Sequence, residues 1–194
     1  IYFEGAPSKF GLEGYQMLKI GLKAKEVSAK ERKDAALVFV IDVSGSMGME
    51  NRLGLVKRAL RLLLDQMREG DSVGIVVYGT NARVITKPLT TEYRDALLEA
   101  IDQLNPEGCT NAEEGLLFGF QMARQFYREG CVNRLILCSD GVANNGVTDA
   151  EGLLRKVKSY AGDGIYLSTL GFGMGNYNDI LMEKLADKGN GNYS

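Results

Sequence analysis

From residue 35 onward the sequence alternates continuous apolar runs with longer segments whose apolar residues recur every three or four positions. Short continuous apolar runs are typical of strands that are buried on both faces, as in a parallel sheet. The segments between them have the periodicity of amphipathic helices. The alternation predicts an α/β fold of the Rossmann-like kind, with a doubly wound, mostly parallel central sheet and helices on both faces. We expect the strands at residues 35–41, 72–78, 134–139 and 165–170.

One short apolar run breaks the alternation. Residues 82–85 follow the strand at 72–78 after the turn 79–81, so this pair is predicted to form a hairpin. Between and after the strands, the helical periodicity extends over residues 51–68, 93–104, 112–127, 148–161 and 180–189. The fourth helix begins with a capping box formed by Thr148 and Glu151.

The first 34 residues have a different pattern. Residues 18–25 alternate apolar and polar side chains, which predicts a strand with one solvated face in an antiparallel pair. A chain of 194 residues suits one well-buried domain better than two. We therefore divide it into an N-terminal extension with one strand, residues 1–34, and one α/β domain, residues 35–194. Because residues 191–194 resemble the start of a strand, we expect the chain to be a piece of a longer protein.

The composition excludes several kinds of chemistry. The chain contains no histidine, so it cannot form a Ser-His-Asp or Cys-His catalytic system or a zinc site with His ligands. Its net charge of −2 leaves no basic excess for phosphates, and we expect no nucleic-acid partner. No apolar run approaches 18 residues, so no direct membrane insertion is expected in this segment. The sequence is compatible with a cytoplasmic, periplasmic or cell-surface parent protein.

The chain has three cysteines, Cys109, Cys131 and Cys138, and none forms a CxxC pair. An odd number at such spacings is a poor disulfide framework and does not indicate a zinc knuckle. Cys138 lies in an apolar run and is expected to be a small buried side chain. The sequence leaves a disulfide between Cys109 and Cys138 open.

Oxygen-bearing side chains gather directly after the strand at residues 35–41. Asp42, Ser44 and Ser46 occupy alternate positions there, and Gly45 allows the chain to turn back tightly so that their oxygens converge. In a doubly wound sheet, ligands bind beyond the carboxyl ends of the strands. The segment is therefore the first candidate for a binding site.

Two further residues are expected at the same edge. Asp140 follows the strand at 134–139, and Thr110 precedes the helix at 112–127. Taken singly, such residues are more often a turn former and a helix cap. Together with the other three they form a set of two carboxylates and three hydroxyls, which suits a hard cation: Mg²⁺, with Mn²⁺ or Ca²⁺ as alternatives.

The sequence resembles a von Willebrand factor type A domain over about residues 35–194. The metal ion-dependent adhesion site of that family has an Asp-x-Ser-x-Ser motif, a later Thr and a later Asp. These match Asp42, Ser44 and Ser46, then Thr110, then Asp140. Residues 39–47, 132–134 and 171–179 are most similar to a bacterial branch that also includes proteins like the inter-alpha-trypsin-inhibitor heavy chains.

The resemblance implies a module that binds a protein partner rather than an enzyme. In the family, the cation keeps an exchangeable position and completes its shell with an Asp or Glu carboxylate of the partner. The alternative is a Mg²⁺-dependent phosphotransfer or hydrolytic domain, because a single Asp at the end of a first strand also occurs in phosphotransfer folds. The haloacid-dehalogenase pattern, however, requires Asp-x-Asp, and the second position here is Ser44.

Overall fold

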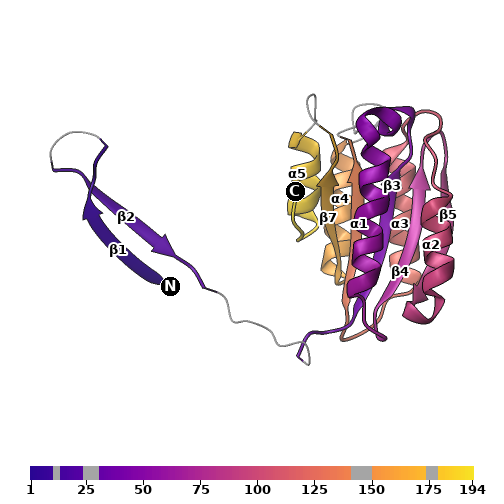
Figure 1. Ribbon diagram of the computed structural model, residues 1–194, viewed down its shortest axis with the longest axis horizontal. Coiled ribbons are helices and arrows are strands. Elements are labelled where there is room, and N and C mark those ends of the chain that lie inside the picture. The colour runs from indigo at the N-terminus through magenta and orange to yellow at the C-terminus, as the bar shows by residue number, and fades with distance from the viewer. Residues whose placement is uncertain (11–13, 24–30, 141–149, 174–178) are drawn as a thin grey trace. The chain divides into compact units, whose positions relative to one another are not determined.

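The computed structural model describes residues 1–10, 14–23, 31–140, 150–173 and 179–194. The chain divides into two units, Ile1–Arg32 and Lys33–Ser194, and each is described by itself. The smaller unit is a hairpin of β1 (Tyr2–Pro7) and β2 (Gln16–Gly21) (Figure 1). The antiparallel pairing predicted for residues 18–25 is confirmed, although β2 ends at Gly21. The N-terminal unit contains two strands, where the sequence predicted one.

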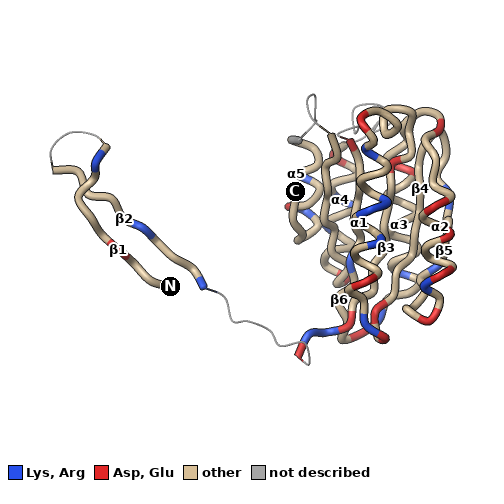
Figure 2. Tube along the Cα trace, viewed as in Figure 1, with Lys and Arg blue, Asp and Glu red and all other residues tan. Residues whose placement is uncertain are grey.

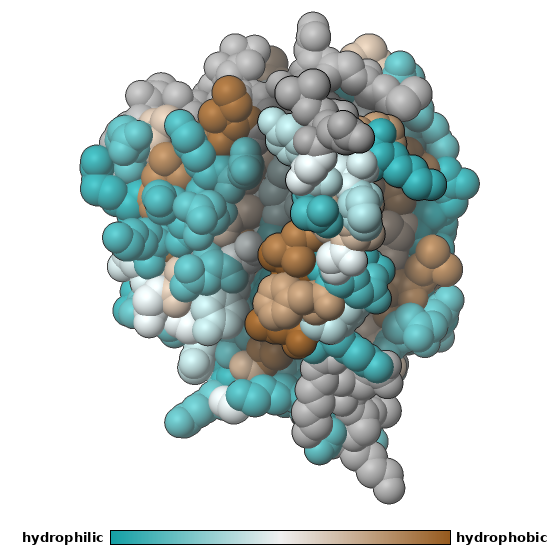
Figure 3. Space-filling view, turned by 90° about the vertical axis from the view of Figure 1, so that its left-hand side faces the viewer, coloured by the Kyte–Doolittle hydropathy of each residue, from teal (hydrophilic) through white to brown (hydrophobic). Residues whose placement is uncertain are grey.

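One face of the hairpin is mostly apolar, and the other combines charged and apolar residues. Phe3 lies opposite Ile20, and next to this pair Leu18 lies on the same side; their exposed fractions are 65%, 59% and 62%. On the other side, Glu4 and Lys19 form an ion pair at 3.1 Å. Hydrophobic residues that reach the surface are brown in Figure 3. The sequence of residues 1–14 did not predict β1, because its glycines and proline hide the strand pattern and only pairing with β2 fixes it.

The larger unit is built on a five-stranded sheet with the order β5-β4-β3-β6-β7. Four strands are parallel, and β5 pairs antiparallel with β4, so the predicted fold class and hairpin are confirmed. β5 extends to Thr90 instead of ending at 85, and its edge position tolerates Pro88. The strands are β3 (Ala35–Asp42), β4 (Ser72–Tyr78), β5 (Ala82–Thr90), β6 (Val132–Ser139) and β7 (Ile165–Gly171).

Helices cover both faces of this sheet (Figure 1). One face carries α1 (Arg52–Gln66) and α2 (Arg94–Asp102), preceded by the short 3₁₀ helices η1 (Gly45–Asn51) and η2 (Thr91–Tyr93). The other carries α3 (Ala112–Gln125), α4 (Ala150–Gly162) and α5 (Asp179–Lys188). The predicted capping residue Thr148 lies outside the described residues.

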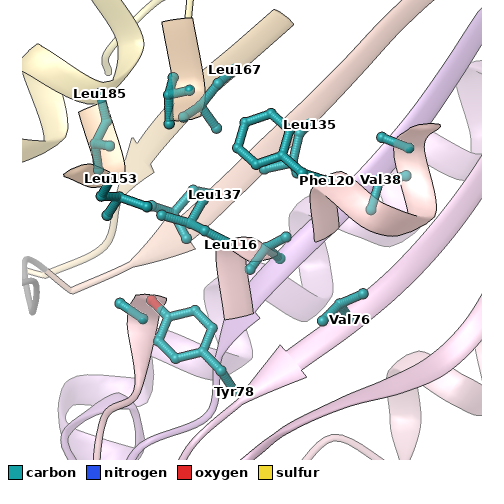
Figure 4. Close-up of a cluster of buried hydrophobic side chains, with 14 of the residues drawn as sticks. Val38, Val76, Tyr78, Leu116, Phe120, Leu135, Leu137, Leu153, Leu167 and Leu185 are labelled. Carbon is teal, nitrogen blue, oxygen red and sulfur yellow. The ribbon is translucent and has the colours of Figure 1, made fainter. Parts of the chain in front are cut away.

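Each face of the sheet has its own hydrophobic core. On the α3 side, Leu116 and Phe120 point toward Val38, Leu135 and Leu137 of the strands (Figure 4). On the α1 side, the core includes the apolar residues of α1 and α2 and alternate residues of β3 and β4. The buried hydrophobic residues of the described chain all lie at position 35 or later. The sheet is thus held rigidly from both sides.

Two glycines bring α3 unusually close to the sheet. A Cβ atom at Gly119 would overlap Cγ2 of Val40 and lie 2.8 Å from Cδ1 of Leu135. A Cβ atom at Gly115 would lie 2.6 Å from Cδ1 of Tyr78. Both distances are shorter than a normal carbon–carbon contact of about 3.5–4.0 Å. The close packing fixes α3, and with it the loop that enters α3, against β3 and β4.

The remaining sequence expectations concern thiols, charge and membrane spans. All three cysteines are free, so the Cys109–Cys138 disulfide that the sequence left open is absent; burial raises the pKa of the Cys138 thiol to about 12. Lys and Arg are interspersed with Asp and Glu over the described surface (Figure 2). In the part of the chain that the structure describes, the helices are too short or too polar to cross a membrane.

Candidate metal centre

The carboxyl ends of β3, β4 and β6 lie side by side at one edge of the sheet, because β3 pairs with both neighbours in parallel. Asp42 is the last residue of β3, and Asp140 follows directly after β6. Asp42 is completely buried, and the side chain of Asp140 is 1% exposed. The topology therefore places two acidic side chains that are 98 positions apart in the sequence at one point, away from bulk water.

Asp42 is held by two hydrogen bonds. Its Oδ1 accepts the backbone N–H of Ser44 at 2.8 Å, and its Oδ2 accepts the hydroxyl of Ser139 at 3.0 Å. Burial raises the pKa of Asp42, the negative charge of Asp140 raises it further, and the hydrogen bonds from Ser44 and Ser139 oppose the rise. The two carboxylates are thus close enough to repel each other, which a cation between them would relieve.

The hydroxyls of Ser44 and Ser46 meet next to Asp42. Ser44 is buried and occupies the N-cap position of η1, and its Oγ lies 3.1 Å from Oγ of Ser46, which is half-buried. The completely buried side chain of Met47 anchors η1 in the core on the α1 side. The local fold therefore directs two neutral oxygen donors to the edge where Asp42 lies.

Backbone hydrogen bonds fix the loop that contains Thr110. The N–H of Glu107 donates to the carbonyl of Val43, and the carbonyl of Gly108 accepts the N–H of Gly45 at 3.2 Å. On the other side of Thr110, the N–H of Asn111 donates to the carbonyl of Gly79 at 2.9 Å. Half-buried Thr110 thus lies between two residues that are tied to the ends of β3 and β4.

Asp140 has a partner that the sequence did not indicate. Nη1 of Arg52, at the start of α1, donates to Oδ2 of Asp140 at 2.9 Å, and Nη2 pairs with Oε2 of Glu50 at 3.1 Å. The other oxygen of Asp140, Oδ1, is buried and has no hydrogen-bond partner among the described residues. Arg52 lies 88 positions before Asp140, and no local sequence signal marks the pair.

Tyr78 lies beside Asp42 on the interior side of the site. Its side chain is completely buried at the end of β4, and burial together with the negative charge of Asp42 holds the pKa of its phenol well above the ordinary value. The phenol therefore stays neutral. Because it is buried, Tyr78 forms part of the floor of the site and does not reach its rim.

The five residues fit a hard cation. A buried carboxylate oxygen without a hydrogen-bond partner is costly, and a cation at this place would satisfy Oδ1 of Asp140. Among the described residues no three Asp, Glu or Cys side chains converge, so a metal ion here would rely on hydroxyl oxygens as well. The donors predicted for it from the sequence are Asp42, Ser44, Ser46, Thr110 and Asp140, all oxygen ligands of the kind that Mg²⁺ prefers.

The raised pKa of Asp42 leads to a prediction for the metal-free protein. Below its unfolded-state pKa, the Asp42 carboxyl is protonated in both the folded and the unfolded protein and does not lower the free energy of unfolding. As the pH rises through the folded-state pKa, the carboxyl becomes charged in the buried site and the free energy of unfolding falls. Asp42→Asn removes the charge. Its amide oxygen can still accept the N–H of Ser44, and its NH2 group can donate to the hydroxyl oxygen of Ser139 in place of accepting from it. In EDTA at neutral pH, we expect the variant to be at least as stable as the wild type by chemical denaturation, with the difference shrinking toward acidic pH. A large loss of stability at neutral pH would contradict this expectation.

The chain is similar in sequence and in structure to known proteins. Residues 37–142 match the family model of the von Willebrand factor type A domain. The chain is 38% identical over 192 residues to the uncharacterized protein YfbK of Escherichia coli, covering 99% of this chain and 33% of YfbK. It is 31% identical to inter-alpha-trypsin inhibitor heavy chain H3 of Mus musculus, covering 80% of this chain and 18% of that protein. The chain thus spans about a third or less of the length of these relatives.

A solved structure gives a similar result. Proximal thread matrix protein 1 from the mussel byssus, with a zinc-occupied metal ion-dependent adhesion motif, aligns with a TM-score of 0.65 and 22% identity. The alignment covers 84% of this chain and 41% of the mussel protein. At this identity the likeness shows a shared fold.

Proposed function

Because the chain belongs to the von Willebrand factor type A domain family, whose members typically mediate protein–protein interactions, we propose that it is a metal-dependent protein-binding module. A divalent cation held by Asp42, Ser44, Ser46, Thr110 and Asp140 would present one open position to an Asp or Glu carboxylate of a partner protein. Residues 35–194 form the binding domain in this proposal, and residues 1–34 are an extension that precedes it.

The observation that carries the proposal is the buried pair Asp42 and Asp140 with the unpartnered oxygen of Asp140. Three of the five donors are neutral hydroxyls, so the cation would be only partly neutralised by the protein. An incompletely neutralised cation attracts an external anion. The cation supplies recognition, and the residues of this chain orient it and exclude water from its protein side.

We propose Mg²⁺ as the cation, with Mn²⁺ or Ca²⁺ as alternatives, because the donors are all hard oxygens. The mussel protein carries zinc in its corresponding motif, so zinc belongs among the metals to be tested. The candidate site has two carboxylates and three hydroxyls, and the chain has no histidine that could serve as a zinc ligand.

An enzymatic role has less support. A phosphotransfer site needs a nucleophile with a separate acid or base nearby. Both oxygens of Asp42 accept hydrogen bonds, Asp140 is paired with Arg52, and position 44 is a serine. The only carboxylates in this set of five residues are Asp42 and Asp140, which the proposal assigns to the metal. The other three residues are hydroxyls and supply no separate acid or base.

The proposal is tested by capture of protein partners with and without metal. The chain is immobilised and exposed to lysate of the source cells in Mg²⁺ or in EDTA, and bound proteins are identified by mass spectrometry. We expect a partner that binds only in Mg²⁺, that is lost with Asp42→Ala, and whose binding fails when one of its surface Asp or Glu residues is changed to Ala. Binding that survives both EDTA and Asp42→Ala would contradict the proposal. Turnover of p-nitrophenyl phosphate that disappears with Asp42→Ala would favour the enzymatic alternative.

A further inference from the structure

The ion pair between Arg52 and Asp140 brings a fixed positive charge to the candidate metal centre. Nη1 of Arg52 lies 2.9 Å from Oδ2 of Asp140, and the Arg52 side chain is 15% exposed. A shielded, charge-assisted hydrogen bond of this length is a strong one. The guanidinium holds one oxygen of Asp140 and leaves the other, Oδ1, without a hydrogen-bond partner among the described residues.

The backbone around Arg52 is built to hold this arrangement. Glu50 and Asn51 adopt left-handed backbone conformations, with φ of +50° and +58°, which non-glycine residues rarely adopt. These two residues turn the chain sharply from η1 into α1. Glu50 then pairs with the second guanidinium nitrogen. The local strain is thus compensated in part by contacts that fix the position of Arg52.

The other side of Arg52 is equally confined. A Cβ atom at Gly173, which has φ of +131°, would lie 2.8 Å from Nε of Arg52. A residue with a side chain at this position would collide with the guanidinium. Gly173, two residues after the end of β7, therefore packs directly on Arg52, and this contact restricts the movement of the guanidinium away from Asp140.

We propose that Arg52 is a built-in counter-ion of the metal centre: it neutralises Asp140 in the metal-free state and keeps the metal-loaded site positively charged. The inference rests on the proposed function. Asp42 and Asp140 together would cancel the two charges of Mg²⁺. With Arg52 added, one positive charge remains, because the carboxylate of Glu50 is 63% exposed and screened by water. That excess attracts the carboxylate of a partner, at the cost of weaker metal binding.

The test is the affinity for Mg²⁺ alone, measured by calorimetry on the full chain. Removing the positive charge with Arg52→Gln should tighten Mg²⁺ binding by about tenfold, because a like charge next to the cation is lost. The same change should lower the melting temperature in EDTA, since Asp140 then remains buried without its partner, and saturating Mg²⁺ should close that gap. Arg52→Lys keeps the charge and should bind Mg²⁺ as the wild type does.

A matched control separates the local effect from net charge. Arg61→Gln removes the same charge from an exposed position of α1, where Arg61 pairs with Asp102, and should leave the Mg²⁺ affinity unchanged. Unchanged or weaker Mg²⁺ binding by Arg52→Gln would overturn the inference. If the wild type itself binds no Mg²⁺, the proposed function fails instead.

A measurement on the wild type avoids dependence on the folding of Arg52→Gln. The Nε–H signal of Arg52 in a ¹⁵N–¹H spectrum is assigned by its loss in Arg52→Lys. Because the guanidinium lies against a proposed metal ligand, this signal should shift on addition of Mg²⁺ to the wild type. A signal that stays in place at saturating Mg²⁺ would overturn the inference.

Discussion

Saturating Mg²⁺ should raise the melting temperature of the wild-type chain by roughly 5–10 °C, and Asp42→Ala should abolish the rise. A ligand at a hundred times its dissociation constant stabilises a folded protein by about 2.7 kcal/mol. For a domain of this size, each kcal/mol corresponds to roughly 2–4 °C. Asp42 is the most deeply buried of the proposed ligands, so its removal takes away the centre of the site. Differential scanning calorimetry in Mg²⁺ and in EDTA measures both effects.

Asp163→Ala is the control for this experiment. Asp163 is an exposed residue after α4, so its replacement changes the net charge by the same amount without touching the site. Its response to Mg²⁺ should equal that of the wild type. Equal responses of Asp42→Ala and the wild type, or no response of the wild type, would disprove the assignment of Asp42 as a metal ligand.

The second large effect concerns packing. Gly119→Ala should destabilise the domain by about 1–3 kcal/mol, because the new methyl group would overlap Val40 and force α3 away from the sheet. Helix propensity alone predicts the opposite sign, a gain of up to about 1 kcal/mol for replacing a helical glycine by alanine. Urea denaturation of the two proteins at equal metal concentration measures the difference.

Gly162→Ala is the matched control, because it is the same replacement at the end of another helix. A Cβ atom at Gly162 has no other atom within 4 Å, so only propensity acts and the variant should be as stable as the wild type or slightly more stable. The opposite signs of the two replacements identify contact with the sheet as the cause. A stabilising Gly119→Ala would mean that α3 can move away from β3 without cost.

Much of the fold was predictable because its strands are buried on both faces. The runs that became β3, β4, β6 and β7 are mostly apolar, and such runs are typical of strands in a buried parallel sheet. β5 was predicted too short, since residues 86–90 include Pro88 and, apart from Leu89, no other large apolar residue. Their pairing depends on β4 and on two register shifts, neither of which leaves a local pattern.

In the candidate site, too, residues marked by a local sequence pattern were predicted, and a residue defined by a contact distant in sequence was missed. Asp42, Ser44 and Ser46 lie within five consecutive residues, and the positions expected for Thr110 and Asp140 follow from the rule that loops at the carboxyl ends of parallel strands meet. Arg52 was missed because an arginine at the start of a helix is an ordinary surface residue in sequence. Its role as a partner of Asp140 depends on contacts across 88 positions and on the unusual backbone at Glu50 and Asn51.

The loop from Glu107 to Asn111 is held to the ends of β3 and β4 by backbone hydrogen bonds. Such bonds do not depend on side-chain identity, so an exposed position such as Cys109 can vary while the backbone of Thr110 keeps its place. In the proposed function, a few side-chain oxygens would hold the metal while the exposed surface around them meets the partner, so this loop is a suitable place to engineer altered specificity.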